Sequence, residues 1–305
     1  MKIYLNKPNE GWIVDRFWEE WYENNQGIST KDFNQADIIW IISPWTWKKI
    51  KKKSLRQKIV VCTIHHIDFK KFKGSEKRNF FKRDKYIDSY HAISNNTKKQ
   101  LEKLTEKPVT TIPFWINDKL FFEINKKNLL REKYEVSENE FLIGSFQRDT
   151  EGVDLISPKL SKGPDQFIKM VKKYSKTNEN LAVVLTGKRR QYIINELKKL
   201  KIKYYYFEMI TFEELNELYN ILDLYIVASR VEGGPQSIFE CAITKTPIIS
   251  TDVGIAKEIL AKESIFDFNQ SFDPKPNTVV AYNNIKKFTI PNWFKGFHNM
   301  FESLM

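Results

Sequence analysis

The amino-acid sequence predicts an α/β protein built from two Rossmann-like domains. Short runs rich in β-branched residues alternate with amphipathic helical segments along the chain. This alternation favours parallel sheets that are covered by helices on both faces. It is interrupted near residues 113–122, which predicts a boundary between two domains. The 305 residues suffice for two domains of roughly 100–200 residues each.

The first predicted domain covers residues 1–117, and we expect the C-terminal helix 291–305 to complete it. Its expected strands are Ile3–Asn6, Ile38–Ile42, Ile59–Ile64, Ala92–Ser94 and Val109–Ile112. Helices are expected over Phe17–Tyr22 and Asn96–Leu104.

The second predicted domain covers residues 118–290. Its expected strands are Phe141–Phe146, Leu181–Thr186, Tyr204–Phe207, Leu224–Ala228 and Pro247–Ser250. Amphipathic periodicity predicts helices over 164–175, 189–200, 212–221, 235–244 and 254–262.

Composition predicts a folded cytoplasmic protein. Hydrophobic residues make up 41% of the chain and charged residues 29%, which excludes a disordered chain. We find no apolar run long enough for a membrane span and no apolar core of a signal peptide. Cys62 and Cys241 lie far apart in apparent core segments, so we expect reduced thiols.

The net charge of +12 is concentrated in one region. Residues 44–83 carry 14 Lys or Arg and only two acids, and Trp45 and Trp47 stand beside Lys48–Lys53. Two interpretations stay open: a solvated lysine-rich surface, or attraction to an anionic membrane, an acidic glycan or nucleic acid. The aromatic residues favour a membrane interface or a sugar over base recognition.

The most informative motif is Ser-Arg-Val-Glu-Gly-Gly-Pro-Gln-Ser-Ile-Phe-Glu at residues 229–240. It follows a buried-looking strand and opens a helix, and Pro235 suits the first helical turn. Gly233 and Gly234 allow a ligand to approach the backbone closely. The amides at the start of this helix, around Gln236 and Ser237, suit a phosphate.

Two carboxylates flank this turn. Glu232 lies in the loop and Glu240 inside the helix, and both can accept hydrogen bonds from hydroxyl groups, as a sugar and a ribose would require. A second strand-to-helix turn at 251–258 contains Gly254 and supplies amides beside the first.

These residues resemble the nucleotide-sugar site of the retaining glycosyltransferases of family 4 (glycosyl transferases group 1). The resemblance is carried by Glu232-x7-Glu240 in a Ser-x-x-Glu-Gly-x-Pro context, followed by the Gly254 turn, and it extends over most of 141–262. It implies the GT-B fold, in which two Rossmann-like domains face each other across a cleft.

The resemblance also implies roles for individual residues. Glu232 would contact the transferred sugar, Glu240 the ribose, and Arg148 with Lys162 the diphosphate. Further donor contacts are implied on neighbouring strand ends: Thr186, Gly187, Glu208 and Met209.

In the first domain, Thr63-Ile64-His65-His66-Ile67-Asp68 resembles the family's Thr-x-His-x-x-Asp pattern. His65 would face the donor sugar, and Gly11 would approach the diphosphate. The expected hinge differs from the family, because Phe114 and Trp115 stand where Asn-Gly is usual.

We therefore expect a retaining hexosyltransferase that uses a UDP- or GDP-sugar and a glycan or lipid-linked acceptor. The sequence contains no Asp-x-Asp, so we expect no metal and no cofactor. We also expect peripheral contact between residues 45–83 and the inner face of an anionic membrane, and no nucleic acid.

Two other classes stay open. One is a GT-B nucleotide-sugar epimerase or phosphorylase-like enzyme, and the other is a basic nucleic-acid- or membrane-binding protein, although no nucleic-acid-binding signature is present. A dehydrogenase is disfavoured because no strand is followed by Gly-x-Gly-x-x-Gly.

Overall fold

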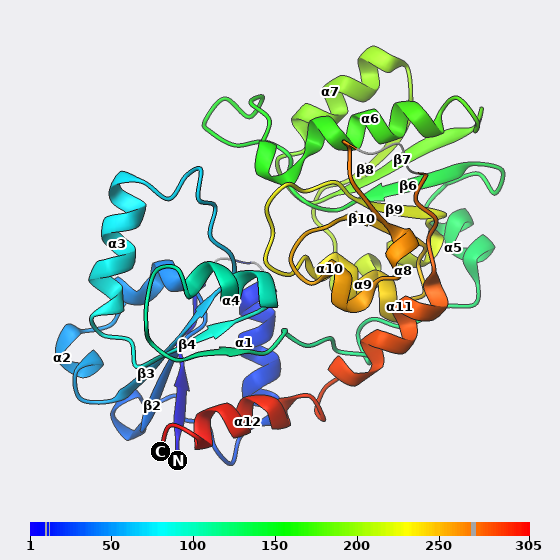
Figure 1. Ribbon diagram of the computed structural model, residues 1–305. Helices are drawn as coiled ribbons and strands as arrows, with labels where there is room; N and C mark the ends of the chain where they lie inside the picture. Colours follow the sequence, from blue (N-terminus) through cyan, green and yellow to red (C-terminus); the bar gives the residue numbers. More distant parts are fainter. Residues whose placement is uncertain (10, 12, 270–272) are drawn as a thin grey trace. The chain divides into compact units, whose positions relative to one another are not determined.

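The computed structural model describes residues 1–9, 11, 13–269 and 273–305. The chain divides into two compact units (Figure 1). Unit 1 is Met1–Phe114 with Pro291–Met305, and unit 2 is Trp115–Ile290. The division expected from the sequence places the first crossing at 117/118 instead of 114/115.

Unit 1 contains a parallel sheet whose strands follow chain order. The strands are β1 (Ile3–Leu5), β2 (Ile38–Ile41), β3 (Ile59–Ile64), β4 (Ser89–Ala92) and β5 (Val109–Thr111). The α-helices are α1 (Ile13–Asn24), α2 (Lys52–Leu55), α3 (Gly74–Asp84), α4 (Asn95–Leu101) and α12 (Phe294–Glu302). Because strand order never reverses among these five strands, this sheet offers no topological switch point.

Successive residues of β2 serve opposite faces of this sheet, as the strand period of two requires. Ile39 and Ile41 belong to a core cluster that includes Phe80 of α3. Trp40 points the other way and packs edge-on against Trp21 of α1, at a centroid distance of 5.1 Å. Both faces are therefore buried, which explains the almost continuous apolar sequence of the strand.

The last helix, α12, completes this second face, next to α1 (Figure 1). The rings of Phe294, Phe297 and Phe301 lie 5.4, 6.3 and 5.8 Å from the ring of Trp21. Trp21 and Phe297 are fully buried. The C-terminal segment thus belongs to the core of the unit in which the chain begins.

A buried polar chain crosses the same face. The indole nitrogen of Trp40 donates to Thr63 Oγ1 at 2.8 Å, and Thr63 Oγ1 lies 2.9 Å from His91 Nδ1. His91 Nε2 lies 2.6 Å from the carbonyl oxygen of Ile112. Burial lowers the pKa of His91 to about 4, so this histidine is neutral and structural.

The outer edge of β1 is occupied by side chains and by a neighbouring loop. The backbone amide of Leu5 donates to the Tyr22 hydroxyl at 3.1 Å, and the Leu5 carbonyl accepts from Trp18 Nε1 at 2.9 Å. Ile3 exchanges backbone hydrogen bonds with Ile28 and Thr30. The polar groups of this edge strand are thereby satisfied within the unit.

Unit 2 contains a six-stranded parallel sheet in the order β11-β10-β9-β6-β7-β8. Its strands are β6 (Phe141–Ser145), β7 (Leu181–Thr186), β8 (Lys203–Phe207), β9 (Leu224–Val227), β10 (Ile248–Thr251) and β11 (Ile265–Phe266). Its α-helices are α5 (Lys127–Lys133), α6 (Pro164–Tyr174), α7 (Gln191–Leu200), α8 (Phe212–Ile221), α9 (Gln236–Ile243), α10 (Ala256–Ile259) and α11 (Thr278–Ile285). Two parallel α/β sheets in one chain confirm the predicted fold class.

The strand order of unit 2 reverses between β6 and β9. The chain builds β6, β7 and β8 outward in one direction and then returns to place β9 on the other side of β6. From these two neighbouring strands the chain continues in opposite directions along the sheet, from β6 to β7 and from β9 to β10. Sheets of this type bind ligands at such a point.

Several element boundaries differ from the expected ones. The strand expected over Ala92–Ser94 ends at Ala92, because the Ser94 hydroxyl caps α4 by accepting from the Thr97 amide at 3.2 Å. Helices expected from 189 and 254 begin at Gln191 and Ala256, after residues with positive φ. The helices α2, α3, α5 and α11 and the strand β11 were not predicted from the sequence.

Among the residues that the structure describes, no helix is both long enough and apolar enough to cross a membrane.

We expect Phe297→Ala to destabilise unit 1 by about 3–5 kcal/mol, because it opens a cavity between Trp21 and Trp40. Urea unfolding followed by tryptophan fluorescence measures this, since all tryptophans in the described ranges except Trp115 belong to unit 1. Met305→Ala is the matched control, because that side chain is 66% exposed. Equal unfolding midpoints for both variants would contradict the conclusion that α12 packs in the core of unit 1.

Candidate functional site

Two loops leave the switch point of unit 2 side by side. Strands β6 and β9 are paired directly, with Ile143 opposite Leu224 and Gly144 opposite Tyr225. The segment 146–163 follows β6 and leads into α6, whereas 228–235 follows β9 and leads into α9. The predicted phosphate-binding cations are on the first loop, and Glu232 is on the second.

An ion pair joins the two loops. Lys162 Nζ donates to Glu232 Oε1, and the Ser229 hydroxyl lies 3.4 Å from the same oxygen. The Glu232 side chain is only 8% exposed, so this pair is weakly screened by solvent. The structure therefore brings Lys162 and Glu232 together, as a site for a charged and hydroxylated ligand requires.

Backbone contacts hold the loops in register. The amides of Arg230 and Val231 both donate to the Ser161 carbonyl, at 2.8 and 3.1 Å. The Arg230 guanidinium forms a two-pronged pair with the Asp165 carboxylate, at 2.7 and 2.6 Å. These contacts connect the two loops. Arg230 was not among the predicted site residues.

Two glycines make this close packing possible. A Cβ atom on Gly163 would lie 1.8 Å from the Ala228 carbonyl oxygen, and one on Gly254 would lie 2.3 Å from that of Gly233. Both glycines also have positive φ, 63° and 52°. Gly163 brings the first loop against the end of β9, and Gly254 brings the 251–255 turn against Gly233 and Gly234.

Helix α9 begins one residue later than expected. Pro235 has ψ 117° and immediately precedes the first helical residue, Gln236, so it does not lie within the first turn. The Gln236 side chain donates to the Trp115 carbonyl at 2.9 Å, and Ser237 hydrogen bonds to Tyr225.

Glu240 lies deeper than Glu232. Its carboxylate accepts from the Tyr219 hydroxyl at 2.8 Å, and the residue is almost completely buried. Burial, followed by the charge of Glu240, raises the pKa of Tyr219 well above its usual value. Tyr219 therefore remains a donor and fixes the orientation of the carboxylate.

A buried ion pair supports the segment that carries Arg148. Arg190 is fully buried and donates to Asp149 at 3.1 Å, and it also donates to the Thr186 carbonyl and the Ser145 hydroxyl. Burial raises the pKa of Asp149 to about 6, although Arg190 opposes the shift. Arg148 precedes this anchor and is half-buried; burial, followed by the Arg189 charge, lowers its pKa.

The remaining predicted donor contacts follow β7 and β8. Gly187 has φ 81°, and its carbonyl accepts from the Tyr206 hydroxyl at 3.1 Å. Thr186 is almost buried at the carboxyl end of β7. Glu208 and Met209 follow β8, and Met209 is 70% exposed.

His65 and Gly11 belong to unit 1, so the structure does not group them with the residues above. His65 follows β3, and its Nε2 lies 2.9 Å from the Ile42 carbonyl oxygen; its ring lies 5.8 Å from Trp45 and 5.7 Å from Phe114. The Gly11 amide donates to Asp15 Oδ2 at 2.7 Å.

Sequence reasoning missed several residues of this site. No role was predicted for Tyr219, Asp149 or Arg190, because each acts through a partner that only the fold brings near. Lys159 does carry a local signal, since it stands three residues before Lys162 in the same loop. Within the described ranges, no group of three or more His, Cys, Asp or Glu is placed to hold a metal ion, and metal independence stays a prediction.

Comparison with protein families supports part of this interpretation. A model of the family described as Glycosyl transferases group 1 matches residues 155–275. That range contains Lys162, Glu232, Glu240 and Gly254. A comparison with curated protein sequences gives no significant match.

Similar solved structures cover nearly the whole chain. The Anabaena protein Alr3699/HepE, solved with UDP and glucose, is 11% identical with a TM-score of 0.76, covering 99% of this chain and 98% of that one. The lipopolysaccharide outer core galactosyltransferase WaaB in its apo form is 13% identical with a TM-score of 0.67, covering 100% of both chains. A glycosyltransferase from Rickettsia africae ESF-5 is 17% identical with a TM-score of 0.61, covering 98% of this chain and 84% of that one.

These likenesses identify the fold as GT-B, as predicted. Together with the matched domain, they show a transferase enzyme of the glycosyltransferase type.

We expect Gly163→Ala to lower the stability of unit 2 by at least about 1–2 kcal/mol, because a left-handed residue gains a side chain that meets the Ala228 carbonyl. Thermal unfolding measures the loss. Gly27→Ala is the matched control, because nothing lies within 4 Å of its added Cβ atom. If both variants melt alike, the close approach at Gly163 is not a constraint on the fold.

Proposed function

We propose that this enzyme is a retaining glycosyltransferase of family 4 that transfers a hexose from a UDP-sugar to a hydroxyl group of a glycan or lipid-linked acceptor. The observation that carries the proposal is the Lys162–Glu232 pair at the switch point of unit 2. The family 4 assignment is supported by Glu232-x7-Glu240 and its flanking turns. UDP is favoured over GDP because a similar structure holds UDP and glucose and another holds UDP-glucose.

The ion pair gives the site a simple way to respond to a donor. Diphosphate oxygens compete with Glu232 for the ammonium group of Lys162, because they carry more negative charge. Once displaced, the Glu232 carboxylate can accept from hydroxyls of the transferred sugar. Charge on the leaving diphosphate then develops beside Arg148 and Lys162, where it is stabilised before and during bond cleavage.

The other predicted residues fit around this centre. We assign the ribose hydroxyls to Glu240, held by Tyr219, and the nucleotide to Thr186, Gly187, Glu208 and Met209. The amides of Gly233 and Gly234 and the start of α9 would add donors to the diphosphate. From the family resemblance, we assign the transferred sugar to His65 and the diphosphate to Gly11.

In this proposal, cationic side chains supply the positive charge that a divalent ion supplies in other transferases, and no cofactor takes part. Transfer with retained configuration would follow a front-face substitution, in which the departing phosphate helps to take the acceptor proton.

We expect Glu232→Gln to reduce UDP release from UDP-hexoses by on the order of 10²–10³-fold while UDP binding persists, because the variant loses the carboxylate but not the cations. UDP binding is measured by thermal shift, with GDP and ADP as competitors and with EDTA or Mg²⁺ added. NMR of the product reports the anomeric configuration.

Glu179→Gln is the matched control, because this carboxylate is exposed in the turn before β7 and forms no part of the site. Near-normal turnover of Glu232→Gln would exclude the proposed role, and an inverted product would exclude retention. A thermal shift with GDP and none with UDP would show that the donor is a GDP-sugar and not a UDP-sugar.

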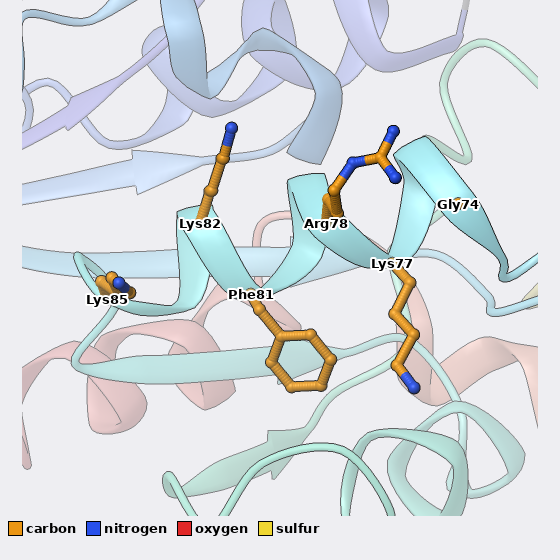
Figure 2. A pocket seen from close by; sticks show the side chains of 6 residues that line it. All are labelled: Gly74, Lys77, Arg78, Phe81, Lys82 and Lys85. Atoms are coloured by element: carbon orange, nitrogen blue, oxygen red, sulfur yellow. The ribbon is translucent and has the colours of Figure 1, made fainter.

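A basic surface on unit 1 supports the predicted contact with an anionic membrane. Helix α3 exposes Lys77, Arg78, Lys82 and Phe81, and Lys85 follows at its C-terminus. Figure 2 shows Arg78 and Lys82 on one side of the helix and Lys77 and Phe81 on the other. Phe81 is 40% exposed, so an apolar ring that can enter the headgroup region accompanies the charges. We propose that this surface holds the enzyme at the inner face of a membrane that contains its acceptor.

We expect the double variant Lys77→Glu/Lys82→Glu to weaken binding to phosphatidylserine-containing vesicles by at least about 10-fold, since each basic residue near such a surface contributes about 1 kcal/mol. Vesicle co-sedimentation measures this. The matched control, Lys176→Glu/Lys198→Glu, reverses two exposed charges of unit 2. Equal vesicle binding by the two double variants would exclude α3 as the membrane contact.

A further inference from the structure

The loop between β6 and α6 is closed by its own backbone. Thr150 and Pro158 form an isolated antiparallel bridge, and the Glu151 amide donates to the Ser157 carbonyl at 3.0 Å. The Lys159 amide then donates to the Asp149 carbonyl at 2.8 Å. The insertion therefore returns the chain to its starting point, so that Lys159 lies beside Asp149, the residue that follows Arg148.

Lys159 is also close to Lys162. The short 3-10 helix η3 (Leu160–Lys162) begins directly after it, and the Lys162 amide donates to the Lys159 carbonyl at 2.8 Å. Arg148 and Lys162 thus flank Lys159 from the two ends of the insertion. All three side chains are partly buried.

The surroundings of Lys159 are unusual for a lysine. Its ammonium group loses hydration and is repelled by Arg148 and Lys162; Glu232 and Glu151 oppose these effects. The net result lowers the pKa of Lys159 to about 8. The charged groups that act on it come from the end of β6, from η3, from the insertion and from the loop after β9.

We infer that Lys159 is a third cation for the donor diphosphate and that it takes up a proton when the donor binds. The inference rests on the proposed nucleotide-sugar function of this site. Burial and two neighbouring cations make the charged form of Lys159 unfavourable before a diphosphate binds. A diphosphate removes that penalty, because its oxygens can accept from three cations at once.

The direction of proton transfer follows from these charges. In the free enzyme, Lys159 is about half neutral at pH 8 and protonated below pH 7. A bound diphosphate favours the ammonium form, so binding above pH 8 draws a proton from solution. The ligand releases none there, because the last phosphate ionisation has a pKa of about 6.

Isothermal titration with UDP tests the inference, in buffers of different ionisation enthalpy at pH 7 and pH 8.5. Wild-type enzyme is expected to take up more than about half a proton at pH 8.5 and almost none at pH 7. Lys159→Gln is expected to weaken UDP binding by on the order of 10–100-fold and to abolish the uptake. Lys159→Arg should retain most of the affinity without the uptake, because a guanidinium is already protonated.

Lys169→Gln is the matched control, since it removes one exposed lysine from α6 and should behave as wild type. If Lys159→Gln equals this control in both affinity and proton uptake, the inference is wrong while the donor site stands. If Lys159→Arg takes up protons as wild type does, another group titrates. Failure of the wild-type enzyme to bind UDP at either pH contradicts the UDP donor itself and, with it, this inference.

Discussion

The candidate site depends on two positions at which one backbone passes a carbonyl group too closely for any side chain. Gly163 lies against Ala228, and Gly254 lies against Gly233, so the loop after β9 is enclosed between two neighbouring turns. This enclosure brings the amides of Arg230 and Val231 to the Ser161 carbonyl. Backbone packing places Glu232 beside Lys162, and the attraction between their charges adds to an arrangement that the packing already fixes. The electrostatics of the site therefore rest on a steric requirement.

Charged groups in the interior of unit 2 act as supports for this arrangement. Removing Arg190 and Asp149 from water costs free energy that the attraction between two buried charges often does not offset. A gain in stability therefore does not explain why the pair is buried. Its geometry does, because Arg190 also binds the ends of β6 and β7 through Ser145 and Thr186. One buried guanidinium thus fixes the chain directly after Arg148. Tyr219 fixes the Glu240 carboxylate by donating a hydrogen bond to it.

Sequence patterns reveal the parts of this protein that are encoded locally. Strand and helix alternation, the strand-turn-helix around Glu232 and the glycine turns each lie within a few residues of chain, so they are readable. Arg190 and Asp149 are 41 residues apart, and Tyr219 and Glu240 are 21 apart, so only the fold reveals these pairs. Helix α3 was missed for a different reason: only Phe80 and Arg83 along its length are buried, and the apolar periodicity is correspondingly weak. The roles of His65 and Gly11 remain predictions that follow from the family resemblance.

The edge of the unit 1 sheet has a consequence for the behaviour of the enzyme among other proteins. Trp18 and Tyr22 occupy the backbone groups of Leu5, and the segment around Ile28 occupies those of Ile3. A foreign strand that approached β1 would have to displace these partners before it could form its first ladder hydrogen bond. Extension of the sheet by a second molecule is blocked along this strand. Trp18 and Tyr22 of α1 thus oppose cross-β self-association at β1, where the apolar residues of the strand would favour it.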